Sequence, residues 1–243
     1  MVDFFELYLR FVNSIYYHHS DIQAVIIDLD GTMVDTLGDF DVALNETLKD
    51  LGRPGVAHTD IERMVGKGSV HLIRSALLHG GLDADEATRV QPEAWARYQA
   101  HYLAINGRHS AVYPGVVEGL TALRGRGLPL ACLTNKPLAF ARPLLQAKGL
   151  AGFFAHVFGG DSFERGKPDP LPLLKTCEAL GSEPAQTLMV GDSQNDALAA
   201  RAASCPVVLV TYGYNHGEPV RQVDADAFVE RLDDLPGLLA ARR

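Results

Sequence analysis

Two acidic residues stand two positions apart at the end of a short apolar segment near the start of the chain. Asp28 and Asp30 follow the apolar residues 24–27, and Gly31 comes directly after them. Side chains two positions apart in an extended segment point to the same side, so these carboxylates converge and repel each other. Mg²⁺ takes oxygen ligands and is bound by carboxylates together with substrate phosphate. The pair therefore predicts a magnesium site for phosphate chemistry, although two solvated acids before a turn would give the same local pattern.

Three further groups of polar residues follow apolar segments later in the chain. They are Thr134 with Asn135, Lys167, and Asp192 with Asp196. Taken singly, each has a simpler explanation, such as a helix cap or a solvated surface lysine. Taken together with the first pair, the carboxylates outnumber the lysine, so the combined site needs a divalent cation for charge balance. Lys167, the Thr134 hydroxyl and main-chain N–H groups could then hold a phosphate beside that cation.

The elements that must position these residues alternate between apolar strands and helices. Alternation of this kind predicts an α/β fold with a doubly wound parallel sheet. Ligands bind such sheets beyond the carboxyl ends of the strands, which is where the polar groups fall. The expected strands are 24–27, 128–133, 156–159, 187–190 and 207–210, and the expected helices are 115–125, 138–148, 171–180, 194–203 and 230–241.

Residues 38–108 interrupt this alternation with a run of helical patterns. Apolar spacing predicts four helices separated by glycine-rich turns, near 38–51, 59–65, 69–80 and 84–106. Thr59 and Glu62 have the spacing of a capping box at the start of the second helix. We therefore expect a helical cap domain, inserted into a Rossmann-like core made of residues 21–37 and 109–243.

The first twenty residues form a separate segment. Apolar side chains recur at helical spacing across residues 4–17, with polar residues between them. This pattern predicts an N-terminal helical extension, residues 1–20. Because its polar face is not rich in Lys or Arg, we expect it to pack on its own domain or on a partner chain rather than on a membrane.

Composition limits the possible partners and the compartment. The net charge is −8 and no run of Lys or Arg occurs, which argues against nucleic acid as a binding partner. The three cysteines are scattered, as in proteins of a reducing compartment. No apolar stretch is long enough to span a bilayer, and the acidic start is unlike a secretory signal. These features predict a soluble, cytoplasmic protein with neither nucleic acid nor membrane as a partner.

The four polar motifs together resemble those of the haloacid dehalogenase-like hydrolases, which include phosphatases with an aspartate nucleophile. The resemblance covers the whole core, in the family's order, and the helical insert looks like the family's mobile cap. The core motifs are DLDGTMVD at 28–35, Thr134-Asn135, Lys167-Pro168, and GDS at 191–193 followed by Asp196. Within the family the chain is most similar to bacterial phosphoglycolate phosphatases, on VGKG at 65–68, TNKP at 134–137 and YGYN at 212–215.

This resemblance implies a two-step mechanism and a role for each matched residue. Asp28 is expected to attack phosphorus and form an aspartyl-phosphate. Asp30 is expected to protonate the leaving alkoxide and then to deprotonate the attacking water. Thr134 and Lys167 are expected to hold the phosphate oxygens, and Asn135 is expected to bind substrate beside them.

The resemblance also implies a metal and a substrate. Mg²⁺ is expected on the Asp28 carboxylate, the Asp30 main-chain carbonyl and Asp192, with Asp196 orienting Lys167 or a metal-bound water. The expected reaction is hydrolysis of a small phosphomonoester, 2-phosphoglycolate above all. Lys67 lies between two glycines in the cap, so it could pair with the carboxylate of such a substrate.

Other activities of related proteins remain as alternatives. Dehalogenases lack an acid at the position of Asp30, which argues for phosphoryl transfer. Mutases of the β-phosphoglucomutase type keep both aspartates but carry an arginine where this chain has Val70 and His71. A β-phosphoglucomutase-like enzyme or a sugar-phosphate phosphatase is therefore the alternative enzyme. A phosphorylated switch module is the alternative outside enzymes, and a monomer and a homodimer are both compatible with the sequence.

Overall fold

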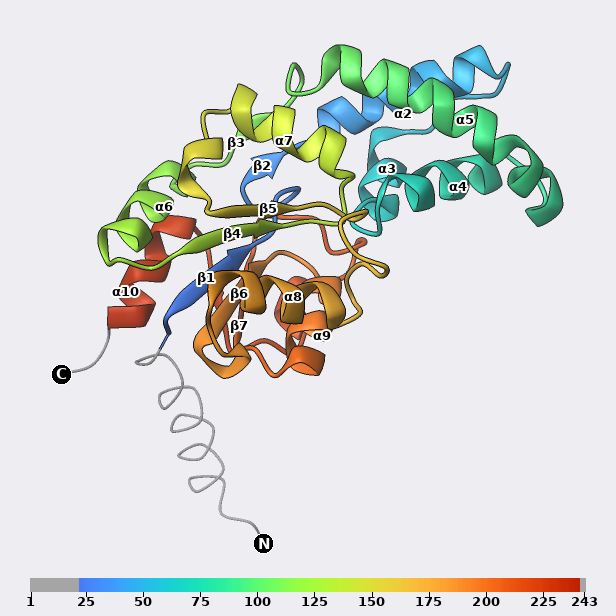
Figure 1. The fold of residues 1–243 in the computed structure, drawn as a ribbon. Coiled ribbons are helices and arrows are strands. Elements are labelled where there is room, and N and C mark those ends of the chain that lie inside the picture. Colours follow the sequence, from blue (N-terminus) through green and yellow to red (C-terminus); the bar gives the residue numbers. More distant parts are fainter. Residues whose placement is uncertain (1–21, 241–243) are drawn as a thin grey trace, which may run out of the picture.

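A six-stranded parallel sheet forms the centre of the computed structural model, which describes residues 22–240 (Figure 1). Its strands lie in the order β5-β4-β1-β6-β7-β8, and all five neighbouring pairs are parallel. The predicted doubly wound parallel α/β fold is thereby confirmed. The strands are β1 (Ala24–Ile27), β4 (Leu130–Leu133), β5 (His156–Phe158), β6 (Thr187–Gly191), β7 (Val207–Val210) and β8 (Ala227–Val229).

Strand β1 lies in the middle of the sheet, and its residues are all apolar, which favours this buried position. All four of its residues are fully buried, as expected for a strand that is covered on both faces. In the register, Ile27 lies beside Cys132 of β4 and beside Val190 of β6. The residues that follow these three strands therefore emerge at the same edge of the sheet.

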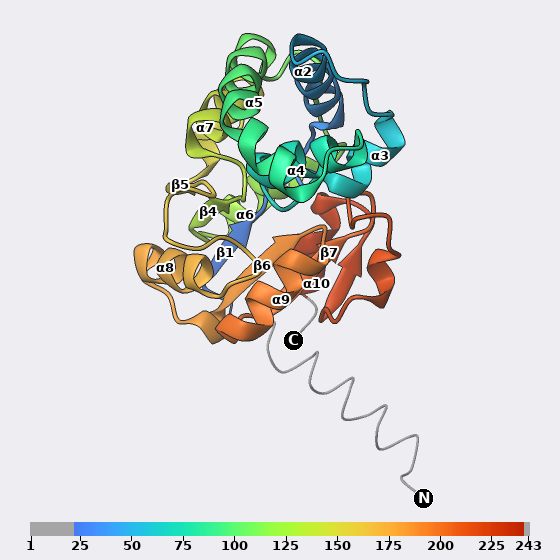
Figure 2. The same ribbon diagram turned by 90° about the vertical axis from the view of Figure 1, so that its right-hand side faces the viewer.

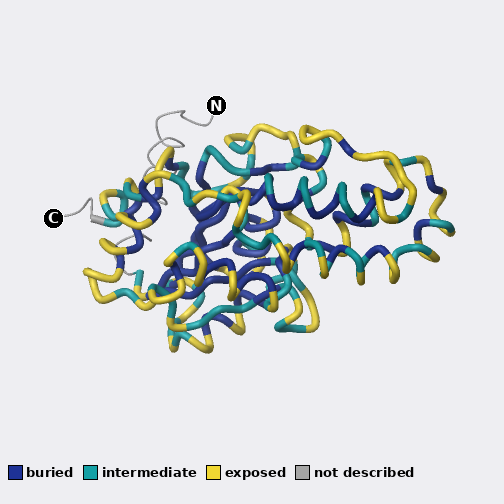
Figure 3. Tube along the Cα trace, turned by 90° about the horizontal axis from the view of Figure 1, so that it is seen from above, coloured by how far each residue is buried: buried dark blue, intermediate teal, exposed yellow. Residues whose placement is uncertain are grey.

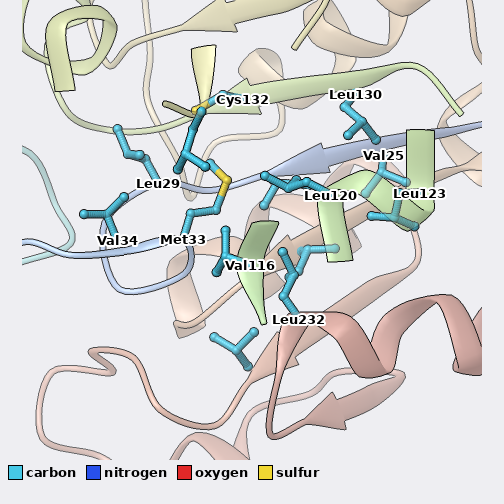
Figure 4. Packing of buried hydrophobic residues seen from close by; sticks show 14 of the residues in the cluster. Val25, Leu29, Met33, Val34, Val116, Leu120, Leu123, Leu130, Cys132 and Leu232 are labelled. Atoms are coloured by element: carbon cyan, nitrogen blue, oxygen red, sulfur yellow. The ribbon is translucent and has the colours of Figure 1, made fainter. Parts of the chain in front are cut away.

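Helices cover both faces of the sheet, and alternate residues of β1 pack against different helices. Val25 and Ile27 belong to a cluster with residues of α6, α7 and α10, part of which is drawn in Figure 4. Ile26 belongs to a second cluster with residues of α8 and α9. The helices are α6 (Val116–Gly125), α7 (Leu138–Ala147), α8 (Leu171–Leu180), α9 (Gln194–Ala203) and α10 (Leu235–Ala240).

Four helices between β2 and β3 form the cap, which has an apolar cluster of its own. In Figure 2 they lie together above the sheet, and in Figure 3 buried and exposed positions alternate along them. Their cluster is rich in aromatic side chains, including Phe40, Tyr98 and Tyr102, and it extends to Phe140 of α7. The cap elements are α2 (Leu37–Asp50), α3 (His58–Met64), α4 (Ser69–His79) and α5 (Ala84–Ile105), and the flanking ribbon is β2 (Val34–Asp35) with β3 (Ala111–Val112).

Two local expectations were wrong, and three short strands were not predicted. The predicted capping box at Thr59 does not form, because the helix begins one residue earlier and its N-cap is Ala57. The last helix begins later than predicted, because residues 232–234 form a 3-10 turn and α10 begins at Leu235. Strands β2, β3 and β8, of two or three residues each, were not predicted, because they are too short to show a periodicity.

Two other expectations are not decided by these elements. The N-terminal extension 1–20, with its helix at 4–17, lies outside the described residues. The domain limits, 38–108 for the cap and 21–37 with 109–243 for the core, stay a prediction. None of the helices within residues 22–240 combines the length and the apolar character needed to cross a membrane.

Candidate active site

The turn after β1 brings the first two acidic residues to the carboxyl edge of the sheet. Gly31 has a φ of +79°, and its N–H donates to the carbonyl of Val34 at 2.9 Å, which folds the chain back on itself. A Cβ atom at Gly31 would lie 2.1 Å from Oδ2 of Asp192, so only glycine fits here. Asp28 and Asp30 therefore stand on a tight loop that packs directly against the loop after β6.

Lys167 is the cation of the core site. Its side chain is 2% exposed, and its Nζ lies 2.9 Å from Oδ1 of Asp28 and 2.7 Å from Oδ1 of Asp196. It also donates to the carbonyl of Leu133 at the end of β4. Burial disfavours its charge, but the carboxylates of Asp196 and Asp28 outweigh burial and raise the pKa of Lys167. Lys167 therefore carries a positive charge beside Asp28 at neutral pH.

Asn135 holds the loop that carries Lys167. Its Oδ1 accepts from the main-chain N–H of Lys167 at 2.9 Å, and its Nδ2 donates to the Lys167 carbonyl at 2.8 Å. Nδ2 also donates to the carbonyl of Gly66 in the cap, at 3.1 Å. The structure thus gives Asn135 a positioning role between core and cap, and its predicted contact with substrate stays a prediction.

The two acids after β6 have different surroundings. Asp196 caps α9 together with Ser193, whose N–H and hydroxyl both donate to Oδ2 of Asp196, while Oδ1 faces Lys167. Asp192 accepts from the N–H of Tyr214 at 2.6 Å and from the hydroxyl of Thr32 at 3.3 Å. Both oxygens of Asp196 thus accept from protein groups, as do both oxygens of Asp192, and the outer role predicted for Asp196 stays a prediction.

The carboxylates of Asp28, Asp192 and Asp196 could together hold a metal ion. One oxygen of each lies within 4.8 Å of the others, and all three residues are buried. Burial raises the pKa of Asp28 to about 7, with further contributions from Asp196 and Asp30 against the opposing effect of Lys167. Burial, together with the neighbouring carboxylates of Asp196 and Asp28, also raises the pKa of Asp192. A cluster with so much uncompensated negative charge fits a hard divalent cation.

The raised pKa of Asp28 predicts a pH-dependent stability in the absence of metal. The folded protein holds this proton more tightly than the unfolded chain, so the free energy of unfolding should fall as pH rises from 3.8 to about 7. Urea unfolding in EDTA across this range would measure the effect. Asp28→Asn is the control, since it lacks the titrating group. The prediction would be contradicted if the difference in the free energy of unfolding between wild type and Asp28→Asn did not change with pH.

Asp30 is held by two donors that sequence reasoning did not identify. Its Oδ1 accepts from the Thr36 hydroxyl at 2.7 Å and from Nζ of Lys136 at 2.8 Å. Lys136 directly follows Thr134-Asn135, so its place after a strand was a signal that could have pointed to it. The predicted use of the Asp30 main-chain carbonyl as a metal ligand stays a prediction.

A second unpredicted contact joins the cap's connecting strand to the core. The hydroxyl of Tyr214 donates to the carboxylate of Asp35 in β2 and accepts from the main-chain N–H groups of Thr36 and Leu37. Tyr214 also donates its own N–H to Asp192. The loop after β7 therefore ties the predicted metal ligand to the segment that leads into the cap.

A pocket lies between the cap and the carboxyl edge of the sheet. Asp28, Asp30 and Thr134 line it from the core, so the structure brings these three predicted site residues together. Gly66 and Gly68 line it from the cap, but the side chain of Lys67 between them is exposed and does not line it. The predicted contact of Lys67 with a substrate carboxylate stays a prediction. The full lining is Asp28, Asp30, Phe40, Val65, Gly66, Gly68, Ser69, Leu72, Thr134, Asn135 and Lys136.

Comparison with known proteins agrees with this arrangement. Residues 22–204 match the family model described as haloacid dehalogenase-like hydrolase. The chain is 45% identical to a phosphoglycolate phosphatase of Thiobacillus denitrificans, over 87% of this chain and 92% of that protein. It is 44% identical to one of Nitrosospira multiformis, over 90% and 96%.

A solved structure supports the same assignment. The crystal structure of a predicted phosphoglycolate phosphatase from Haemophilus somnus is similar with a TM-score of 0.82 and 33% identity, covering 90% of this chain and 98% of that one. The family model covers most of the chain, and the relatives are matched over nearly their whole length. The chain therefore belongs to the haloacid dehalogenase-like hydrolases.

Proposed function

We propose that this protein is a Mg²⁺-dependent phosphatase that hydrolyses 2-phosphoglycolate to glycolate and phosphate. One observation carries the proposal: the buried carboxylate of Asp28 lies 2.9 Å from Nζ of Lys167, and Asp28 lines a pocket together with Asp30 and Thr134. A nucleophile, a cation for phosphate oxygens and a separate acid are the groups that phosphomonoester hydrolysis requires. The relatives named phosphoglycolate phosphatase support the choice of substrate.

The reaction would proceed in two displacements at phosphorus. An oxygen of Asp28 forms a bond to phosphorus while the bond to the ester oxygen breaks, and Asp30 gives its proton to the departing alkoxide. Asp30 then takes a proton from water, the water oxygen bonds to phosphorus, and the aspartyl-phosphate bond breaks to release phosphate. Lys167 and the Thr134 hydroxyl hold the non-bridging oxygens in both steps.

The metal site would also stabilise the negative charge of the phosphoryl group. Asp28 and Asp192 would hold Mg²⁺ through carboxylate oxygens, and the Asp30 main-chain carbonyl would add a ligand. Bound Mg²⁺ supplies positive charge that offsets the negative charge of the transferring phosphoryl group. Asp196 would keep Lys167 in place, as its 2.7 Å contact with Nζ indicates.

A substrate panel tests the proposed function. The full-length protein is assayed with 2-phosphoglycolate, hexose phosphates and p-nitrophenyl phosphate, each in Mg²⁺ and in EDTA. We expect turnover in Mg²⁺ and none in EDTA, with the highest kcat/KM for 2-phosphoglycolate. A higher kcat/KM for hexose phosphates, activity that ignores chelation, or a single stoichiometric phosphorylation without turnover would each contradict the proposal.

Asp30→Asn should reveal the acid role through the leaving group. An alkoxide needs a proton as it departs, whereas p-nitrophenolate leaves without one. We therefore expect a loss of roughly 10²- to 10⁴-fold in kcat on 2-phosphoglycolate and a much smaller loss on p-nitrophenyl phosphate. The ratio of the two losses, measured at one pH, is the readout. Equal losses on both substrates would mean that Asp30 is not the acid.

A further inference from the structure

Lys136 is a buried lysine that the phosphoryl-transfer steps leave without a role. Its side chain is 1% exposed, and its Nζ lies 2.8 Å from Oδ1 of Asp30. The same Nζ lies 4.3 Å from the centroid of the Phe40 ring and 4.7 Å from that of Tyr102. Phe40 and Tyr102 belong to the cap helices α2 and α5. A lysine of the core therefore ends between the acid and the inner face of the cap.

The ammonium group of Lys136 has more donors than the described residues use. An ammonium carries three N–H groups, and the only acceptor recorded for them within residues 22–240 is Asp30. Aromatic faces stabilise a cation but accept no strong hydrogen bond. Since Lys136 also lines the pocket, a ligand in the pocket can reach the unused donors.

Other polar groups of the cap lie close to Lys136 or line the pocket. The hydroxyl of Tyr102 is buried and has no partner in the described part of the chain. Helix α4 begins at Ser69, and the residue before it, Gly68, provides no side chain to cap the free N–H groups of its first turn. Both Gly68 and Ser69 line the pocket. Buried donors without acceptors favour a ligand that brings an anion into this part of the pocket.

We propose that Lys136 selects phosphomonoesters that carry a carboxylate next to the ester carbon, by donating a hydrogen bond to that carboxylate. This rests on the proposed function, which places Asp30 at the ester oxygen. Because Lys136 contacts Asp30 directly, an anion bound by Lys136 lies within a few ångströms of that oxygen. A short phosphorylated 2-hydroxy acid has its carboxylate at this distance, whereas the far end of a hexose phosphate does not.

The test compares two substrates that differ in the carboxylate. The full-length wild-type protein and Lys136→Met are assayed in Mg²⁺ with 2-phosphoglycolate and with ethyl phosphate, which has a two-carbon alkoxide and no carboxylate. We expect Lys136→Met to lower kcat on both substrates, because Asp30 loses a donor, and to lower kcat/KM on 2-phosphoglycolate by roughly a further tenfold through KM. Equal losses would mean that Lys136 acts through Asp30, and would overturn the proposal.

Three further variants sharpen this comparison. Lys136→Arg keeps the charge and should keep most of the preference for the carboxylate. Lys49→Met removes an exposed lysine of the cap, whose side chain is 73% exposed, and should match wild type on both substrates. Lys67→Met tests the cap lysine predicted from the sequence. A selective loss at Lys67 with none at Lys136 would overturn the proposal.

A binding measurement separates this proposal from the proposed function. In the Asp28→Asn background, which should not turn over, calorimetry gives the Kd of each phosphate ester with and without Lys136→Met. We expect the added change to weaken 2-phosphoglycolate at least about tenfold and ethyl phosphate little. Unequal weakening without any wild-type turnover would contradict the proposed function alone, and equal weakening would contradict the role of Lys136. Thermal unfolding of each variant verifies that it is folded.

Discussion

Asp28→Asn is expected to reduce kcat by roughly 10⁴-fold or more while the protein stays folded, because the change removes the nucleophile of a covalent reaction. The asparagine has nearly the same shape as the aspartate. Burial raises the pKa of Asp28 to about 7, so a neutral side chain at this position relieves repulsion from the neighbouring acids. We therefore expect a thermal midpoint equal to or above that of wild type at neutral pH.

The control for this variant is another aspartate changed in the same way. Asp224→Asn alters a side chain that is 83% exposed and pairs with Arg201 at the surface, so its activity should equal that of wild type. Kinetics with 2-phosphoglycolate and thermal unfolding are measured on both variants. Residual activity within about tenfold of wild type in Asp28→Asn would refute the covalent role.

Lys167→Met should lose both activity and stability. We expect kcat to fall by roughly 10³-fold, as is typical when one preorganised donor to developing negative charge is lost. We also expect the free energy of unfolding to fall by about 3–5 kcal/mol, because the buried carboxylates of Asp28 and Asp196 lose the cation at 2.9 and 2.7 Å. Urea unfolding in EDTA measures the second effect.

Mg²⁺ should restore part of the stability lost in Lys167→Met, because the same acids could hold the metal. Lys175→Met is the matched control on the adjacent helix α8, where the lysine is half exposed and pairs with Glu178. Its stability and activity should stay close to those of wild type. A Lys167→Met protein as stable and active as this control would contradict the charge balance described for the site.

The position of the core motifs followed directly from the sequence. Asp28, Thr134 and Asp192 each directly follow a short apolar strand, and parallel pairing places the ends of these strands at one edge. Lys167 was assigned to the same edge, and the structure places its Nζ against Asp28. These positions are predictable because they depend on local patterns and on one topological rule.

The contacts between cap and core could not be predicted in the same way. Lys136 and Asp30 are separated by 106 positions, and the rings that enclose Lys136 come from α2 and α5. No sequence periodicity encodes how two domains face each other. Lys67 was predicted to contact substrate because glycines flank it. Its side chain is exposed and does not line the pocket, and the sequence alone could not show this.

Asn135 illustrates a different limit. The family resemblance implied a contact with substrate, which stays a prediction, whereas the structure shows that its amide group holds both main-chain polar atoms of Lys167 and that Asn135 also lines the pocket. A side-chain amide can serve ligands or loops equally well, because it offers both donors and an acceptor. Only the fold decides which partner lies within reach.

The measurement that tests the account most directly is the detection of the phosphorylated enzyme intermediate. The wild-type protein is mixed with 2-phosphoglycolate and Mg²⁺, quenched in acid within the first turnover and digested, and its peptides are analysed by mass spectrometry. The account predicts one added phosphoryl group on the peptide that contains Asp28. It predicts no such group when the protein is quenched without having been mixed with substrate. Phosphoryl groups on another residue, or complete turnover with none on Asp28 at any quench time, would contradict it.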